Sequence, residues 1–92
     1  MRVCVIGLGR MGRGMAINLV NKGNVVYGYD VNRAVYAVVS GAGVKTVDTI
    51  GQCSNSDYVI LALPTGRESA QVLGELGTNA IIIDTTTMSL TE

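Results

Sequence analysis

The chain contains no histidine, no tryptophan and no phenylalanine, and its aromatic residues are four tyrosines in 92 residues. Cys4 and Cys53 do not form a C-x-x-C pair, so the sequence lacks the clustered nitrogen and sulfur ligands that transition metals prefer. The hydrophobic fraction of 48% against an aromatic fraction of 4% is typical of an α/β core rich in valine, isoleucine and alanine. We therefore expect no metal site and no interface built on aromatic anchors.

Net charge is also absent, because seven basic and seven acidic side chains cancel. This balance gives no electrostatic attraction to nucleic acid or to an anionic membrane. No segment approaches the roughly 20 apolar residues that a membrane span needs. Met1 and Arg2 lead into an apolar strand pattern rather than a secretory signal. The sequence predicts a protein whose partners include neither nucleic acid nor a membrane.

The two cysteines follow no recognisable spacing. Cys4 lies inside the first apolar run and Cys53 in a polar stretch. We interpret Cys4 as a small buried hydrophobic residue rather than a catalytic thiol. Two unpatterned cysteines also predict a reducing compartment, and hence a cytoplasmic location.

Glycine, by contrast, is abundant, and three of the 12 glycines form the spacing G-x-G-x-x-G. The motif directly follows the apolar run Val3–Ile6 and directly precedes a helical pattern. In that context Gly7 permits a tight strand-to-helix turn, Gly9 leaves room for a pyrophosphate, and Gly12 lets the helix approach the strand. The amides at the start of the helix would then bind the negative charge. The motif therefore predicts a dinucleotide-binding domain over residues 1–92.

Hydrophobic periodicity alternates along the chain between strands and helices. Gly23 is predicted to end the first helix and Gly41 the second. The alternation predicts an α/β fold of the Rossmann type, a doubly wound parallel sheet of five strands in the order 3-2-1-4-5. The predicted strands are 2–6, 25–29, 43–45, 58–62 and 80–83, and the predicted helical segments are 10–22, 32–40, 48–52 and 65–76.

Ligands of such sheets bind beyond the carboxyl ends of the strands. Asp30 ends the second predicted strand, 18 positions after Gly12, close to the spacing at which a carboxylate accepts the adenine-ribose hydroxyls of NAD. Arg33 lies three residues later and is able to accept the 2′-phosphate of NADP instead. We favour NAD, because the acid occupies the discriminating position, and keep NADP as the alternative.

The segment Val5–Leu19 resembles the amino-terminal signature of the β-hydroxyacid dehydrogenases, the family of 3-hydroxyisobutyrate dehydrogenase that is related to 6-phosphogluconate dehydrogenase. Its run G-L-G-x-M-G-x-x-M-A-x-N-L is much more specific than the glycines alone. Two later segments agree, since Val59–Pro64 resembles the family's strand ending in Leu-Pro and Ile82–Thr87 its Asp-x-Ser-Thr segment. The resemblance covers essentially the whole chain.

This resemblance implies roles for individual residues. Asp30 would hold the adenine ribose, Leu63 and Pro64 the nicotinamide half, and Thr86 and Thr87 the border between nicotinamide and substrate. Without the resemblance, we would favour the interpretation of Thr86 and Thr87 as β-branched continuation of a strand over a functional role. The residues implied for the pyrophosphate are Gly7, Leu8, Gly9, Arg10, Met11 and Gly12.

Three departures from the family pattern bear on the substrate. Thr86 replaces the family's serine, Leu90 replaces its usual proline, and the stretch between Pro64 and Asp84 is shorter than usual. These departures leave the identity of the substrate open, but none of them changes a residue implied for the cofactor site.

The family also has a catalytic lysine in a G-x-x-x-K-x-x-N motif, within a helical domain that follows the nucleotide domain. No such motif occurs in residues 1–92, and the two lysines, Lys22 and Lys45, read as a helix-end charge and a strand or loop charge. We therefore assign no catalytic residue in this chain, interpret it as a truncated cofactor domain, and expect it to be inactive alone.

The sequence is consistent with two functions. The favoured one is the cofactor domain of an oxidoreductase that transfers hydride between a nicotinamide cofactor and a small β-hydroxy acid. The alternative is a non-catalytic module that senses NAD(P) or mediates an interaction, because one fold serves many functions. Apolar surface near the fifth strand also predicts self-association into a homo-oligomer.

Overall fold

The central strand of the sheet is β1 (Arg2–Ile6). All of its residues but the first are buried, as expected for a parallel strand covered on both faces. The strand pairs in parallel with β2 (Val25–Tyr29) and with β4 (Tyr58–Leu61). β3 (Lys45–Thr46) extends the sheet beyond β2, and β5 (Ile81–Asp84) extends it beyond β4. The resulting order β3-β2-β1-β4-β5 confirms the predicted topology.

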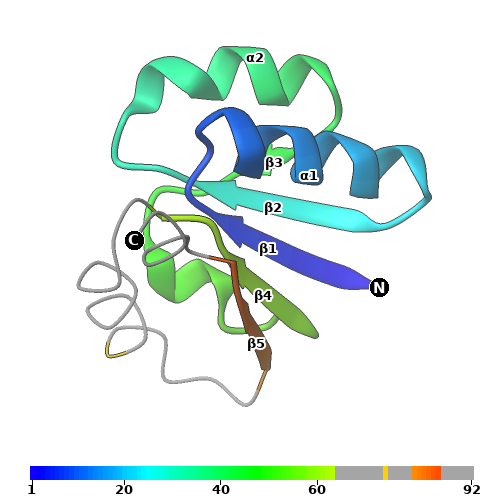
Figure 1. Ribbon diagram of the computed structural model, residues 1–92, viewed down its shortest axis with the longest axis vertical. Helices are drawn as coiled ribbons and strands as arrows, with labels where there is room; N and C mark the ends of the chain where they lie inside the picture. Colours follow the sequence, from blue (N-terminus) through cyan, green and yellow to red (C-terminus); the bar gives the residue numbers. More distant parts are fainter. Residues whose placement is uncertain (64–73, 75–79, 86–92) are drawn as a thin grey trace, which may run out of the picture.

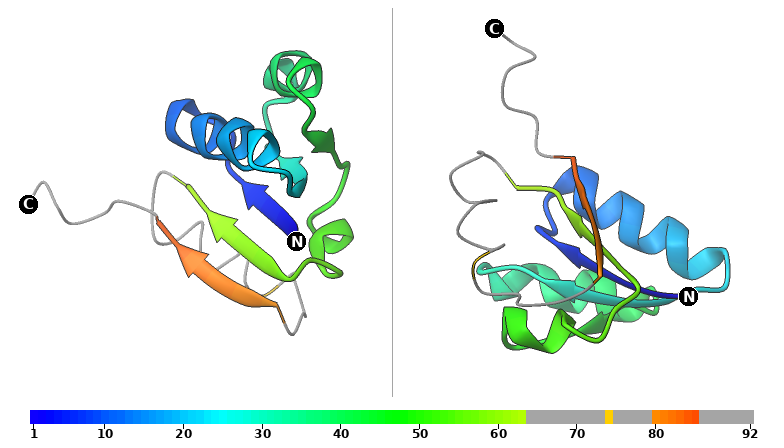
Figure 2. Two further views of the ribbon diagram at one scale, coloured as in Figure 1. Left: turned by 90° about the vertical axis from the view of Figure 1, so that its right-hand side faces the viewer. Right: turned by 90° about the horizontal axis from the view of Figure 1, so that it is seen from below.

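The computed structural model describes residues 1–63, 74 and 80–85 of the chain. Two helices, α1 (Arg10–Asn21) and α2 (Tyr36–Gly41), lie on one face of the sheet (Figure 1). The short 3-10 helix η2 (Ile50–Cys53) lies on the opposite face (Figure 2). Within the described ranges, no helix is long and apolar enough to cross a membrane.

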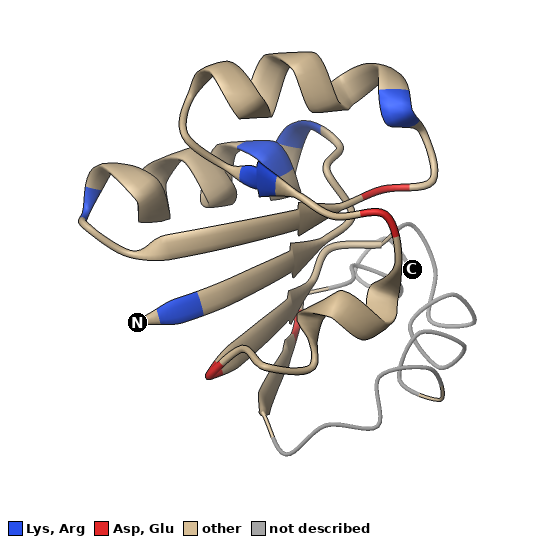
Figure 3. Cartoon of the chain, turned by 180° about the vertical axis from the view of Figure 1, so that it is seen from behind, with Lys and Arg blue, Asp and Glu red and all other residues tan. Residues whose placement is uncertain are grey.

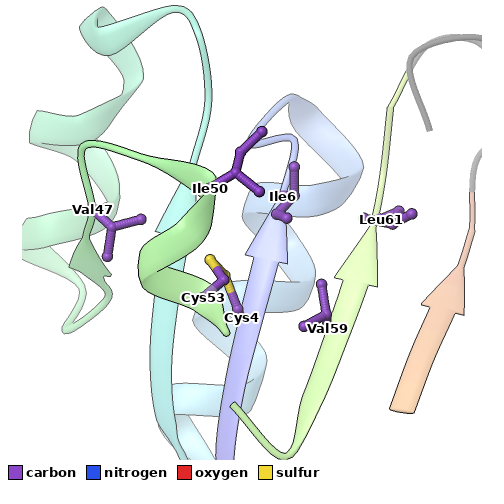
Figure 4. Packing of buried hydrophobic residues seen from close by; sticks show 7 residues of the cluster. All are labelled: Cys4, Ile6, Val47, Ile50, Cys53, Val59 and Leu61. Carbon is purple, nitrogen blue, oxygen red and sulfur yellow. A yellow bond between two sulfur atoms is a disulfide. The ribbon is translucent and has the colours of Figure 1, made fainter. Parts of the chain in front are cut away.

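Successive residues of β1 supply two separate hydrophobic cores, because side chains of a strand alternate between its faces. Val3 and Val5 face the helices, while Cys4 and Ile6 face η2 (Figure 4). The core beside the helices is completed by Leu8, Ala16, Val26, Val39 and Val44. The core beside η2 is completed by Val47, Ile50, Cys53, Val59 and Leu61.

The first helix ends as its sequence predicts. α1 covers Arg10–Asn21, one residue short of the predicted span, and Gly23 follows it with a φ of +95°. The Gly23 amide donates to the carbonyl of Val20 at 3.0 Å. A glycine just past the helix adopts this left-handed conformation without the steric cost of a side chain.

The second predicted helix differs from the observed structure. Asn32, the first residue of the predicted span, is the cap, and its side chain accepts from the Ala34 amide at 3.1 Å. The first turn, however, is a 3-10 helix, η1 (Arg33–Val35), and α2 begins only after it. The prediction that Gly41 stops the helix is wrong, because Gly41 is its last residue and Gly43 takes the left-handed turn, with a φ of +102°.

The predicted boundaries of the later elements move by at most two residues. Because Gly43 closes α2, the third strand begins at Lys45 instead of residue 43. Thr49 caps η2, and the Gln52 side chain accepts from the amides of both Asp48 and Thr49 at 2.8 Å, which keeps Asp48 outside the helix. The fourth and fifth strands end at Leu61 and Asp84. The predicted helix over 65–76 lies, apart from residue 74, outside the described residues.

Cys4 and Cys53 form a disulfide, which the absence of a recognisable spacing between them did not predict. Their Cα atoms are 5.7 Å apart although 49 positions separate them in sequence. The predicted burial of Cys4 is confirmed, since both cysteines are fully buried. The parallel sheet places η2 against the middle of β1, and the spacing of the cysteines in sequence does not reveal this contact. The expectation of a reducing compartment rested on the absence of a cysteine pattern, and the disulfide no longer supports that expectation.

We expect reduction of this disulfide to destabilise the fold. Closing a loop of 49 residues is worth about 4 kcal/mol in the chain-entropy treatment of the unfolded state. Dithiothreitol should therefore lower the free energy of unfolding in urea by about 2–4 kcal/mol. The Cys4→Ala/Cys53→Ala variant is the control and should show no response to the reductant. Equal unfolding midpoints with and without reductant, in wild-type chain shown by mass spectrometry to be oxidised, would contradict the expectation.

Candidate functional site

The candidate site lies at the edge of the sheet where the parallel strands end. The segment after β1, Asp30 after β2, and Ala62 and Leu63 after β4 all begin at this edge, because neighbouring parallel strands share one direction. Figure 3 shows basic and acidic residues close together at this end of the molecule. The polar residues that the sequence placed at strand ends are thus brought to one edge.

Gly7 makes the turn that leaves β1. Its φ of +101° lies in the left-handed region, and its amide donates to the carbonyl of Tyr29 at 2.8 Å. A Cβ atom at Gly7 would overlap the carbonyl oxygen of Ala62. Both the dihedral angle and the space therefore require glycine at this position.

Gly12 and Gly9 have different surroundings. A Cβ at Gly12 would overlap the carbonyl oxygen of Gly7 and approach the Ala62 Cβ to 3.2 Å, so glycine lets α1 press against the turn. At Gly9, by contrast, a Cβ would have no atom of the described residues within 4 Å apart from its chain neighbours. Packing therefore explains Gly12, whereas Gly9 borders open space that a ligand is able to enter.

The start of α1 presents unpaired amides to that space. Gly9 is the N-cap with φ −68° and ψ −169°, no side chain caps the helix, and its first turn carries no acidic residue. Within the described part of the chain, no acceptor is found for the amides of Gly9, Arg10, Met11 and Gly12. A helix of 12 residues adds the positive end of its dipole. Helix starts of this kind are suited to anionic groups such as a pyrophosphate.

Leu8 supports the loop from inside. Its side chain is fully buried between α1 and the sheet, and its amide donates to the Asp30 Oδ2 at 2.7 Å. Gly28 provides the space, because a Cβ there would lie 3.1 Å from the Leu8 Cδ1. The Leu8 amide is thus already bonded, in contrast to those of the next four residues.

Asp30 is half-buried at the end of β2, and both of its carboxylate oxygens accept a backbone amide. Oδ2 accepts from Leu8, and Oδ1 accepts from Asn32 at 2.8 Å. The carboxylate is therefore held beside the glycine loop, with acceptor capacity left for further hydroxyl donors, since an ionised carboxylate has about four acceptor sites.

Arg33 is held at the side of the site. Its guanidinium donates to the Asp48 carbonyl at 3.0 Å and forms an ion pair with the Asp48 carboxylate at 3.4 Å. The guanidinium carbon also lies 5.4 Å from the centroid of the Tyr29 ring and 5.3 Å from that of Tyr36. Sequence reasoning missed Asp48 and Tyr36 as neighbours of the site, because neither residue belongs to a motif.

The remaining predicted residues are only partly described. Arg10 and Met11 are exposed at the start of α1. Leu63 packs against the core beside η2. Pro64, Thr86 and Thr87 lie outside the described residues.

Comparison with known proteins agrees with this geometry. Residues 2–92 match the family described as the NAD binding domain of 6-phosphogluconate dehydrogenase. The chain belongs to this family. It is 36% identical over 78 residues to L-threonate dehydrogenase of Haemophilus influenzae, which covers 82% of this chain and 26% of that enzyme. It is 33% identical over 95 residues to a probable 3-hydroxyisobutyrate dehydrogenase of Mycobacterium bovis, which covers 98% of this chain and 32% of that protein.

A solved structure extends the likeness to three dimensions. The structure of Mycobacterium tuberculosis 3-hydroxyisobutyrate dehydrogenase with L-serine superimposes with a TM-score of 0.87 at 30% identity. The match covers 98% of this chain and 33% of that chain. The resemblance to the β-hydroxyacid dehydrogenases is thereby confirmed, and the chain spans about a third of the length of these relatives.

We expect Gly9→Ala to weaken cofactor binding while leaving the fold intact. The added methyl group would meet no atom of the described residues within 4 Å beyond its chain neighbours, but it would occupy part of the open space at the start of α1. The expected loss is at least about tenfold in NAD affinity by calorimetric titration, with a change of less than about 1 kcal/mol in stability.

Gly14→Ala is the matched control, because a Cβ at Gly14 also has no neighbour within 4 Å in the part of the chain that the structure describes, but lies further along α1. This variant should keep the wild-type affinity and gain up to about 1 kcal/mol in stability, since alanine favours a helix over glycine. Equal NAD affinity in the Gly9→Ala and Gly14→Ala chains would contradict the assignment of Gly9.

Proposed function

We propose that the chain is the cofactor domain of an oxidoreductase that transfers hydride between a nicotinamide dinucleotide and a small β-hydroxy acid. The observation that carries the proposal is the row of four amides at the start of α1, from Gly9 to Gly12, that have no acceptor among the described residues and follow the open space at Gly9. These amides would hold the pyrophosphate, and Arg10 and Met11 border the same position. Bound there, the nicotinamide supplies the hydride chemistry.

The position of Asp30 supports NAD rather than NADP. A carboxylate in this place accepts the two ribose hydroxyls of adenosine and repels a 2′-phosphate. The Leu8 and Asn32 amides hold the carboxylate in position before any ligand arrives. Arg33 is the residue that would favour NADP, and its guanidinium is bonded to Asp48.

The other end of the cofactor is assigned by the family resemblance. Leu63 and Pro64 would contact the nicotinamide half, while Thr87 would lie at its border with the substrate and Thr86 would contact the substrate itself. The names of the relatives, which are dehydrogenases of small hydroxy acids, support a substrate of this class. Self-association fits the exposure of Ile81 and Ile83 on the edge strand β5.

We expect Asp30→Ala to weaken the binding of NAD more than that of NADP. The variant removes the acceptor of the ribose hydroxyls, and hydrogen bonds to a charged group are worth about 1.5–3 kcal/mol, or roughly 10- to 100-fold in affinity. The binding of NADP should fall less, because the repulsion of its 2′-phosphate disappears as well. Calorimetric titration with NAD, NADH, NADP and NADPH under matched conditions measures both effects.

Asp57→Ala is the control for this titration. Asp57 also accepts a backbone amide, that of Arg2 at 2.9 Å, but just before β4, at the opposite end of the sheet. Its loss should lower stability without changing the affinity for any of the four nucleotides. Equal losses of NAD and NADP affinity in the Asp30→Ala chain would remove Asp30 from the proposed role.

We further expect that residues 1–92 alone oxidise no β-hydroxy acid. Lys22 lies at the carboxyl end of α1, about 18 Å from the start of the helix, since each residue rises about 1.5 Å. Lys45 lies in β3, the outermost strand beside β2. Neither is placed to exchange a proton with a substrate beside the glycine loop. Formation of NADH by the purified chain from any β-hydroxy acid would contradict this expectation.

A further inference from the structure

The hydroxyl of Tyr36 joins two segments that flank the candidate site. It donates to the Val47 carbonyl at 2.7 Å and accepts from the Asp30 amide at 3.1 Å. The Asp30 carbonyl, 3.3 Å away, is a second and longer acceptor for the same hydroxyl hydrogen. One half-buried side chain thus links the residue after β2 with the residue after β3.

This link begins where the backbone pairing of β2 and β3 ends. The last bond between these segments runs from the Val47 amide to the carbonyl of Gly28 at 3.0 Å. β3 covers only two residues, so it offers Asp30 no further ladder partner. The Tyr36 hydroxyl takes the place of that partner and satisfies both the amide of Asp30 and the carbonyl of Val47.

Asp30 is consequently held from two sides. Its main chain is bonded to Tyr36, while its carboxylate accepts the amides of Leu8 and Asn32. A change in the main chain at Asp30 would shift the carboxylate relative to the glycine loop. The position of Tyr36 therefore couples the loop after β3 to the orientation of the carboxylate.

The ring of Tyr36 has a separate contact. The Arg33 guanidinium carbon lies 5.3 Å from its centroid. Phenylalanine would keep this contact and the packing of the ring but would lose the hydroxyl. The substitution Tyr36→Phe therefore isolates the link between Asp30 and Val47.

We propose that Tyr36 is a positioning residue for cofactor recognition, whose hydroxyl fixes Asp30 so that its carboxylate faces the adenine ribose of NAD. This inference rests on the proposed function, in which Asp30 accepts the ribose hydroxyls. Tyr36 itself acts through Asp30 and needs no contact with the nucleotide.

A double-mutant cycle tests whether Tyr36 acts through Asp30. Calorimetric titration with NAD should show that Tyr36→Phe weakens binding about 3- to 10-fold, as expected for the loss of one hydrogen bond. In the Asp30→Ala background the same substitution should change the affinity less than twofold. An equal loss in both backgrounds, or no loss in the wild-type background, would overturn the proposal. A general loss of stability would not by itself produce this difference between backgrounds.

Tyr58→Phe is the matched control. Tyr58 is likewise half-buried, but it begins β4 at the far end of the sheet, and no hydrogen bond of its hydroxyl is found within the described ranges. Removing this hydroxyl should leave NAD affinity at the wild-type value. If Tyr58→Phe lowered NAD affinity as much as Tyr36→Phe does, the loss of any half-buried tyrosine hydroxyl would explain the effect. That result would also overturn the proposal.

Hydrogen exchange of the Asp30 amide provides a measurement that needs neither a variant nor NAD. Bonded to a half-buried hydroxyl, this amide should exchange at least tenfold more slowly than in an unstructured peptide, as measured by NMR on the wild-type chain. Exchange at the unstructured rate would contradict the link. Failure of the wild-type chain to bind NAD, with a protected Asp30 amide, would instead overturn the proposed function and with it the role of Tyr36 in recognition, while leaving the link intact.

Discussion

The hydrogen bond from the Leu8 amide to the Asp30 carboxylate is the interaction on which the site depends. At 2.7 Å it joins the residue that follows the glycine turn to the end of β2. The buried side chain of Leu8 fixes one side of this bond, and Gly28 provides the space for that side chain. Because the loop and the carboxylate are held together by the fold itself, a nucleotide would find them already ordered, which reduces the entropic cost of binding.

The glycines around this bond have two different roles, one in the packing of the fold and one in access to the proposed site. Gly7 and Gly12 are required by the protein's own atoms, since a side chain at either would overlap a backbone carbonyl oxygen. Gly9 has no such neighbour within 4 Å among the described residues, and the absence of a side chain there leaves room in which another molecule could approach the start of α1. Close packing at Gly7 and Gly12 brings the start of α1 to the end of β1. The absence of a side chain at Gly9 leaves the amides at the start of the helix accessible.

The opposite face of the sheet contributes to the site through the chain after β3. The disulfide between Cys4 and Cys53 ties η2 to β1, the strand that leads into the glycine turn. Val47 packs in the core beside η2 and receives the Tyr36 hydroxyl from the other layer. Both layers therefore support the position of Asp30, although η2 contributes no residue predicted to contact the cofactor.

The sequence by itself determined the sheet order, the glycine turn and the place of Asp30, because these follow from local periodicity, from one contiguous motif and from the shared direction of parallel strands. It misplaced the end of the second helix, where Gly41 and Gly43 offer the same signal and only the observed backbone distinguishes them. The partners of Cys4, of Tyr36 and of the Leu8 amide were decided by the tertiary structure alone. Each of these contacts joins segments from different strands or layers, and their separation in space is set by how the whole chain packs, which no local pattern encodes.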